Sequence, residues 1–311
     1  MEVFQDVEFV RLRSRVDGKY LLASEDGRSV HLAARHASYR AVWAVETIHA
    51  AAEGGGDGVL LPGHVLLRGA YGRYLGAPDA ISHFWAPCCC WPAVGQRDFD
   101  DRDEVNAIVW RPVGLGAAAG DGVVLLHDKS DRYLRVNERW LPFLAGVAAF
   151  NNGDLNMMMQ WEVLPVPTTL FRRDLPAMGH RFDYPPSRKI QWVIADNSGS
   201  VDEDNWSSME FAGRSVRLLI QDLDALQLTL CIRAGSHGRL TPLLINLPRS
   251  WETLHVVFVR PNTAVLNVNV VLNTRGHNQL RFPDMDADVY GYLTGPSTEG
   301  SGYLTEVSLV D

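Results

Sequence analysis

This 311-residue sequence has few cysteines, no long apolar run and no excess of positive charge. Four cysteines are too few for a disulfide scaffold, and the three at 88–90 are adjacent, where they cannot easily pair with one another. No apolar run approaches the roughly 18 to 20 residues that span a bilayer. The acidic N-terminus also lacks the basic-then-apolar pattern of a signal peptide. These absences predict a cytoplasmic protein with reduced thiols, with the nucleus as a second compartment and no membrane as a partner.

Common catalytic and cofactor-binding patterns are also missing. The sequence has no Gly-x-Ser-x-Gly, P-loop, His-Glu-x-x-His or Cys-x-x-Cys motif. The glycines from Gly114 to Gly120 imitate a dinucleotide-binding loop, but no strand-helix-strand unit surrounds them. A net charge of −8 opposes binding to nucleic acid. We therefore expect no enzyme activity, no catalytic residues, no cofactor and no metal site.

One phrase occurs three times in the first half of the chain. Each copy holds an alternating apolar stretch, a polar turn, a Tyr-Leu pair and a later tryptophan. The copies contain Val10-Arg11-Leu12-Arg13, Tyr20-Leu21 and Trp43; Val65-Leu66-Leu67-Arg68, Tyr74-Leu75 and Trp110; and Val124-Leu125-Leu126-His127, Tyr133-Leu134 and Trp161. A triplicated all-β unit that cannot bury its apolar face alone predicts a β-trefoil over residues 1–167. We expect the repeated Tyr, Leu and Trp side chains to fill its shared interior.

The second half begins with a proline-punctuated linker over residues 168–187. Alternating strands are then predicted at 188–196, 209–215, 228–233 and 254–259, with a helix over 216–226 that Ser215 would cap. One helix on a mixed sheet in about 75 residues predicts a ubiquitin-like α+β module over 188–262. We expect residues 263–311 to be a β-rich extension with a loose terminus. The predicted fold class is therefore mainly β, a trefoil followed by a ubiquitin-like (β-grasp) module.

Several phrases resemble a plant family that joins a fascin-like (actin-crosslinking type) β-trefoil to a ubiquitin-like C-terminal module. The resemblance lies in Gly18-Lys19-Tyr20-Leu21 of the first half and, more specifically, in Ile190–Asp196, Phe211–Ser215, Leu230–Gly235 and Gly238–Leu243. It covers roughly residues 1–260, and the tail from Asn262 does not match. The resemblance carries over no catalytic residue. It suggests actin as a partner by analogy of fold alone.

Candidate partner-binding residues fall in three groups. The second repeat has an insertion, Cys88–Glu104, in which we expect Trp91 and Phe99 to be exposed beside Asp100 and Asp101, unless this is only a solvated loop. Arg11, Arg13 and Lys19, with Arg15 and Arg28, could form a basic face toward an acidic partner, unless they are the solvated side of a strand. In the second module Arg233 and Arg239, with Arg214, His237 and Arg249, form a cationic set. We hold it more plausible that these cations pair with Asp196, Asp202, Glu203 and Asp204 inside the module.

The function expected from these patterns is a non-catalytic interaction or scaffold protein, with actin as one candidate partner. A carbohydrate-binding trefoil is the alternative. Many trefoil lectins end their repeats with Gln-x-Trp, but the residues two before the closing tryptophans here are Ala41, Ile108 and Met159. A glycan partner is therefore the less favoured class, and the sequence leaves the oligomeric state open.

Overall fold

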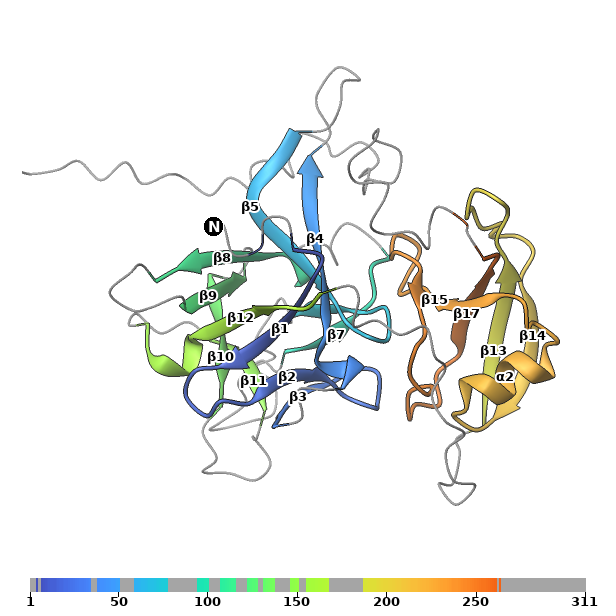
Figure 1. Ribbon diagram of the computed structural model, residues 1–311, viewed down its shortest axis with the longest axis horizontal. Coiled ribbons are helices and arrows are strands. Elements are labelled where there is room, and N and C mark those ends of the chain that lie inside the picture. Colours follow the sequence, from blue (N-terminus) through green and yellow to red (C-terminus); the bar gives the residue numbers. More distant parts are fainter. Residues whose placement is uncertain are drawn as a thin grey trace, which may run out of the picture.

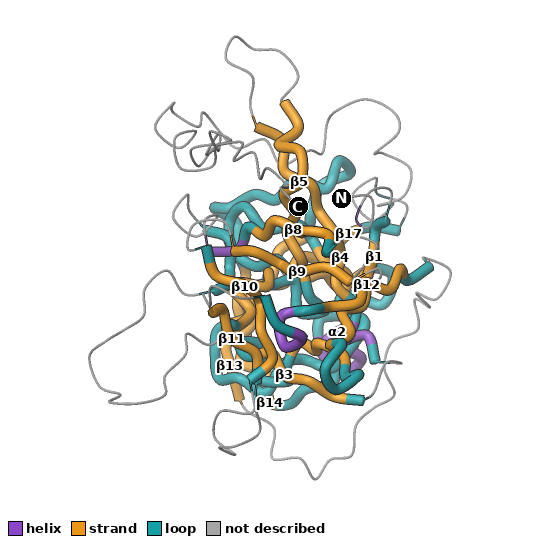
Figure 2. The backbone as a smooth tube through the Cα atoms, turned by 90° about the vertical axis from the view of Figure 1, so that its left-hand side faces the viewer, coloured by secondary structure: helices purple, strands orange, loops and turns teal. Residues whose placement is uncertain are grey.

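The computed structural model contains two β-rich domains packed against one another (Figure 1). It describes residues 4, 7–34, 38–50, 59–77, 94–100, 107–115, 122–127, 131–137, 146–150, 155–167, 187–261 and 263. Seen from the side of the first domain, the described backbone is nearly all strand and loop (Figure 2). Within the described ranges, no helix has the length and apolar character needed to cross a membrane.

The first domain consists of three four-stranded repeats. The first contains β1 (Phe9–Ser14), β2 (Tyr20–Ala23), β3 (Val30–Ala33) and β4 (Trp43–Ala50), with a 3₁₀ turn, η2 (Tyr39–Ala41). The second contains β5 (Val59–Arg68), β6 (Tyr74–Gly76), β7 (Gly95–Arg97) and β8 (Trp110–Gly114). The third contains β9 (Gly122–His127), β10 (Arg132–Val136), β11 (Val147–Phe150) and β12 (Trp161–Pro165), with a 3₁₀ turn, η5 (Met157–Met159).

Six of these strands close into a ring, which confirms the predicted trefoil. The first and last strands of each repeat pair in the order β1-β4-β5-β8-β9-β12, and β12 pairs again with β1. The two middle strands of each repeat form hairpins, β2–β3, β6–β7 and β10–β11. Closure leaves the six-stranded ring without a free sheet edge, so its inward side chains can form one core.

The three tryptophans are equivalent and lie in that core. Trp43, Trp110 and Trp161 are each fully buried, and each indole Nε1 donates a hydrogen bond to the backbone oxygen of the leucine in its repeat's Tyr-Leu pair. The three N···O distances are 3.1, 2.8 and 3.0 Å. A buried indole needs such an acceptor. The repeated Leu-Trp combination is therefore the structural unit of the core.

A left-handed backbone residue lies two positions before each repeated tyrosine. Gly18, Gly72 and Asp131 have φ values of 68°, 77° and 46°. This conformation is free of strain for glycine and accessible to aspartate, which explains why these residue types occupy the turns. All three repeats therefore have a left-handed residue at this turn position, although the third has aspartate in place of glycine.

Two details of the predicted repeat are wrong. The third copy begins one residue earlier than we expected, because Val123 pairs with Trp161 as Val10 pairs with Trp43 and Val65 with Trp110. Because residues 123 and 124 are both valine, the sequence does not show at which of them the apolar-polar alternation of the third repeat begins. The tyrosines do not share the interior either, because Tyr20 and Tyr133 are only half-buried. Tyr74 is fully buried, but under the second domain, as described below.

The second domain is a five-stranded sheet with one helix. Its elements are β13 (Ser187–Ile194), β14 (Ser207–Ala212), α2 (Val216–Asp222), β15 (Thr229–Ile232), β16 (Thr241–Pro242) and β17 (Leu254–Val259). The strand order is β14-β13-β17-β15-β16, and β13 and β17 are parallel. Ser215 caps α2 as predicted, since its Oγ accepts from the amide of Leu218 at 3.3 Å. The mixed sheet with its single helix confirms the predicted ubiquitin-like fold class, although α2 ends four residues earlier than expected.

The core position of the repeated tryptophans predicts that removing one of them costs much more stability than removing an exposed tryptophan. We expect Trp161→Ala to lower the free energy of unfolding by about 3 to 5 kcal/mol, because it leaves a cavity and an unsatisfied carbonyl. Trp251→Ala, which removes a largely exposed ring in the second domain, should change it by less than about 0.5 kcal/mol. Urea denaturation followed by circular dichroism measures both. Equal losses would contradict the assignment of the repeated tryptophans to the core.

Candidate functional site

Among the described residues, the seam between the two domains holds the largest set of ion pairs and hydrogen bonds between distant segments. Three trefoil segments take part: the β2–β3 turn (25–28), the β5–β6 turn with the residue on either side of it (68–74) and the residues after β7 (98–100). They contact residues 232–241 and 247–252 of the second domain and Arg214, which follows β14. Buried apolar side chains of both domains also form one continuous cluster. The domains therefore share part of their core.

A buried ion pair lies at the centre of this seam. The Nε of Arg68, at the end of β5, is 2.5 Å from Oε1 of Glu46 on β4, and both side chains are almost fully buried. Nη1 of Arg68 donates to the hydroxyl of Thr241 in β16. Burial alone would lower the pKa of Arg68, but the neighbouring Glu46 carboxylate raises it above its ordinary value. The guanidinium thus stays charged while it joins the two domains.

Tyr74 extends this cluster. Its hydroxyl donates to Oε2 of Glu46 at 3.2 Å and accepts from the amide of Arg239 at 3.3 Å. Burial, with the Glu46 carboxylate beside it, raises the pKa of Tyr74, so the phenol stays protonated and can donate. Both carboxylate oxygens of Glu46 and two nitrogens of Arg68 therefore have partners, as buried charges require.

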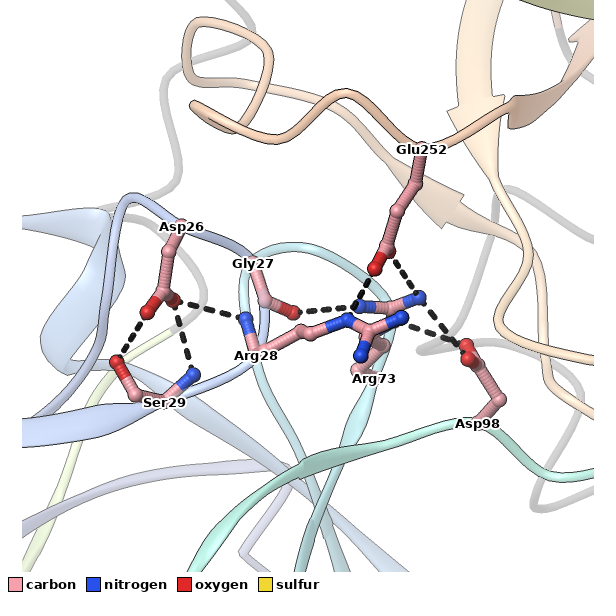
Figure 3. Close-up of polar contacts among 7 residues, drawn as sticks. All are labelled: Asp26, Gly27, Arg28, Ser29, Arg73, Asp98 and Glu252. Carbon is pink, nitrogen blue, oxygen red and sulfur yellow. Dashed lines mark hydrogen bonds and ion pairs between the residues drawn. The ribbon is translucent and has the colours of Figure 1, made fainter.

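Arg73 makes a second, partly buried bridge (Figure 3). Its Nε and Nη2 bind the two oxygens of Asp98 at 2.9 Å each, and its Nη1 donates to the carbonyl of Gly27 at 2.9 Å. Nη2 also lies 3.0 Å from Glu252 of the second domain, which Arg28 contacts as well. Burial would lower the pKa of Arg73, but Asp98 and Glu252 raise it. One guanidinium thus ties both trefoil turns to the 247–252 loop.

Glu25 is the third bridge. Its carboxylate lies 3.4 Å from Arg40 of the trefoil, 3.3 Å from Arg214 and 2.9 Å from Arg249. The amide of Arg249 also donates to the carbonyl of Glu25. We favoured pairing of Arg214 and Arg249 with acids of their own module, and this interpretation is wrong for both. Their partner belongs to the trefoil because the docked turn brings Glu25 closer than any of the acids that we named.

The segment after β7 pairs with the second domain through its backbone. The amide of Phe99 donates to the carbonyl of Ala234 at 3.0 Å, and the amide of His237 donates to the carbonyl of Phe99 at 2.9 Å. The Phe99 ring is 1% exposed and packs edge-on against Tyr74. Our expectation of an exposed Phe99 is wrong, because the second domain covers it. Asp100 accepts from the amide of Ser236 at 2.7 Å, so it too has an internal partner.

The other predicted site residues lie apart from one another. Arg13 pairs with Glu162 at 3.2 Å, Lys19 pairs with Asp17 at 2.9 Å, and Arg11 is half-buried on the same strand as Arg13. Arg233 pairs with Glu203 at 2.5 Å, as the interpretation of pairing inside the module predicts. Arg239 meets the seam through its backbone. Trp91 and Asp101 lie outside the described residues, as do the adjacent cysteines 88–90.

Sequence reasoning missed the main seam residues, which are Glu25, Glu46, Arg68, Arg73 and Glu252. One signal could have indicated the docked turn. The β5–β6 turn has Tyr71 before its left-handed glycine, where the first repeat has the charged Asp17. An aromatic residue at a turn position that is polar in the other repeats predicts a covered surface. Tyr71 is indeed buried, and burial raises its pKa to about 12.

Comparison with known proteins agrees with this two-domain division. Residues 1–149 match the family model described as a β-trefoil domain of unknown function (DUF569), and residues 186–259 match the DUF569-associated ubiquitin-like domain. The trefoil and ubiquitin-like parts of the predicted resemblance are thus confirmed. The fascin-like type and the plant origin stay predictions. No curated protein matches the chain.

Solved structures match only at low similarity. A designed three-fold symmetric protein, ThreeFoil, has 19% identity and a TM-score of 0.38, over 51% of this chain and 99% of its own. The SDF2-like protein from Arabidopsis thaliana has 13% identity and a TM-score of 0.36, over 51% and 94%. A ricin B-like lectin from Macrolepiota procera, in complex with lactose, has 13% identity and a TM-score of 0.35, over 51% and 95%.

The trefoil repeat supplies a matched control for the buried ion pair. Arg13 occupies the position in β1 that Arg68 occupies in β5, but the Arg13–Glu162 pair is more than 40% exposed on both sides. We expect Arg68→Ala to lower the free energy of unfolding by about 3 to 5 kcal/mol, because it leaves the Glu46 charge buried and unpaired. Arg13→Ala should lower it by less than about 1 kcal/mol. Denaturant titration of both variants measures this difference, and a loss below 1 kcal/mol for Arg68→Ala would show that Glu46 is not isolated from water.

Proposed function

We propose that this chain, a DUF569 β-trefoil domain joined to its associated ubiquitin-like domain, is a non-catalytic protein-interaction scaffold whose two domains act as one binding unit. The observation that carries the proposal is the seam. Three trefoil segments contact the second domain. The contacts are the hydrogen bond from Arg68 of the buried Arg68–Glu46 pair to Thr241, the Arg73 and Glu25 bridges and the backbone pairing at Phe99. Such an interface holds the outer surfaces of both domains in a fixed relation, as a composite binding surface requires.

The charged groups in the seam serve docking rather than chemistry. The ionisable side chains of the central cluster are buried against one another, and Tyr74 is held protonated. The Cys231 thiol is buried and its pKa is raised to about 12 by burial, which makes it a poor nucleophile at neutral pH. Among the described residues, no group of three His, Cys, Asp or Glu side chains could hold a metal ion. These features support an interaction role for the seam residues.

Actin and glycans are the partner classes to separate within this proposal. The basic face that actin would use is already engaged, because Glu162 pairs with Arg13 and Asp17 pairs with Lys19. This weakens the support for actin, and no described feature favours a sugar. Co-sedimentation with filamentous actin and a glycan array distinguish the two classes. Binding to filaments through this face would fall in Arg13→Glu and Lys19→Glu and would weaken with salt.

The proposal predicts that partner capture depends on docking. In the docking variant Glu25→Arg/Gly235→Ala, a new cation faces Arg40, Arg214 and Arg249, and the added Cβ meets the backbone of Phe99. We expect the variant to keep its strand content but to show a larger radius of gyration in small-angle scattering. Its capture of partners from a lysate should fall at least fivefold by quantitative mass spectrometry.

The matched control is Glu210→Arg/Gly199→Ala. It makes the same charge change on the exposed β14 and places alanine at another glycine of positive φ, away from the seam. This variant should capture partners as the unaltered chain does. Undiminished capture by an opened docking variant would show that the domains bind independently and would refute the composite unit.

A further inference from the structure

Three methionines follow one another in the 3₁₀ turn η5, directly before β12, and each has a different environment. Met157 is 57% exposed, Met158 is half-buried and Met159 is fully buried. Asn156 caps the turn, since its Oδ1 accepts from the amide of Met158 at 3.1 Å. All three side chains carry the same thioether group. Any difference in the reactivity of their sulfur atoms therefore comes from the fold.

The sulfur of Met158 accepts a hydrogen bond from a guanidinium group. Nη2 of Arg135, on β10, donates to this sulfur at 3.1 Å, and the same guanidinium lies 4.9 Å from the ring centroid of Phe150 on β11. A thioether sulfur is only a weak acceptor, but the donor covers one of its two lone pairs. Among the residues that the structure describes, none donates to the sulfur of Met157. A reagent from solvent can therefore approach Met158 only at its other lone pair.

Peroxides oxidise thioethers to sulfoxides, and the lone pair that reacts determines the product. The sulfur attacks one oxygen of hydrogen peroxide, so that a sulfur–oxygen bond forms and the oxygen–oxygen bond breaks. The departing hydroxide takes the proton of the transferred oxygen and leaves as water, so the sulfur is oxidised and the peroxide is reduced. Because the new oxygen replaces one lone pair, the sulfoxide is chiral and has two epimers. A sulfur with one covered lone pair should give one epimer in excess.

We infer that η5 is a site of reversible oxidation by peroxides, with different products at Met157 and Met158. Met157 gives both sulfoxide epimers, because its side chain is exposed. Met158 gives mainly one, because Arg135 covers one of its lone pairs. Met159 stays reduced while the trefoil is folded, since its side chain is fully buried. Sulfoxide reductases restore the thioether, one enzyme for each epimer, so the repair of Met158 depends mainly on one of them.

Arg135 is a positioning residue in this site, because it directs the oxidant without reacting. The site lies in the third repeat, whereas the described trefoil residues of the seam belong to the first and second repeats. The inference therefore does not rest on the proposed scaffold function. Oxidation should leave the docking of the two domains unchanged.

Treatment of the full-length protein with hydrogen peroxide, followed by digestion and tandem mass spectrometry, tests this site. Met157 should be oxidised at least about tenfold faster than Met159, because exposure controls access to the sulfur. Each epimer-specific sulfoxide reductase, applied to the digested product, then measures the two epimers at each position. Met158 should show an epimer excess of at least about 3:1, and Met157 a ratio of about 1:1.

The variant Arg135→Leu separates the effect of the hydrogen bond from that of burial. Leu22 occupies the equivalent position of the first repeat, two residues after Tyr20 as Arg135 is two residues after Tyr133, so leucine suits this strand position. The variant should keep its strand content by circular dichroism, and the epimer ratio at Met158 should fall to about 1:1. The control Arg111→Gln, which changes an exposed arginine of β8, should keep the excess.

Equal epimers at Met158 in the unaltered chain would refute the directed oxidation, and this measurement needs no variant. An excess that persists in Arg135→Leu would show that burial alone directs the oxidant and would refute the role of Arg135. Oxidation of Met159 as fast as Met157 in the folded chain would contradict the order of reactivity. None of these results changes the dependence of partner capture on docking, so the scaffold proposal stands or fails separately.

Discussion

The guanidinium of Arg68 lies where water is excluded, and it remains there as a cation only because Glu46, Tyr74 and Thr241 surround it. Two of these partners come from the trefoil and one from the ubiquitin-like domain. Removing the second domain would return the ion pair to solvent and expose Phe99 and Tyr71 with it. Because breaking a buried pair is strongly unfavourable, the arrangement of the two domains depends on this cluster more than on any exposed bridge.

Comparison of the three repeats shows which trefoil residues serve the fold and which serve contact with the second domain. All three repeats keep the buried tryptophan, its bond to the leucine carbonyl and the left-handed turn residue. Among the described residues of the trefoil, the docking residues belong to the first and second repeats, and the equivalent Arg13–Glu162 pair stays in solvent. The same strand position thus serves as a solvated surface in one repeat and as a domain interface in the next. The three repeats share one fold, and the differences between their turns create the seam on which the proposed function rests.

Much of the fold was predictable because its signals are local. Strand alternation and the Ser215 cap lie within short stretches of sequence, and the phrase that ends in tryptophan occurs three times, so these signals predicted the elements apart from their exact bounds. The third-repeat register failed where Val123 and Val124 are both apolar, so the period of two became ambiguous. The site was less predictable because it depends on contacts between distant segments. Glu25 meets Arg249, and Arg68 meets Thr241, across more than 170 residues, and no local pattern in one sequence encodes such a pairing.

Differential scanning calorimetry of the full-length chain tests the central claim that the two domains form one unit. If the shared apolar cluster and the buried ion pair couple them, the chain should unfold in a single transition whose calorimetric and van't Hoff enthalpies agree. Two separate transitions, each with its own enthalpy and each unaffected by substitutions in the other domain, would contradict the account.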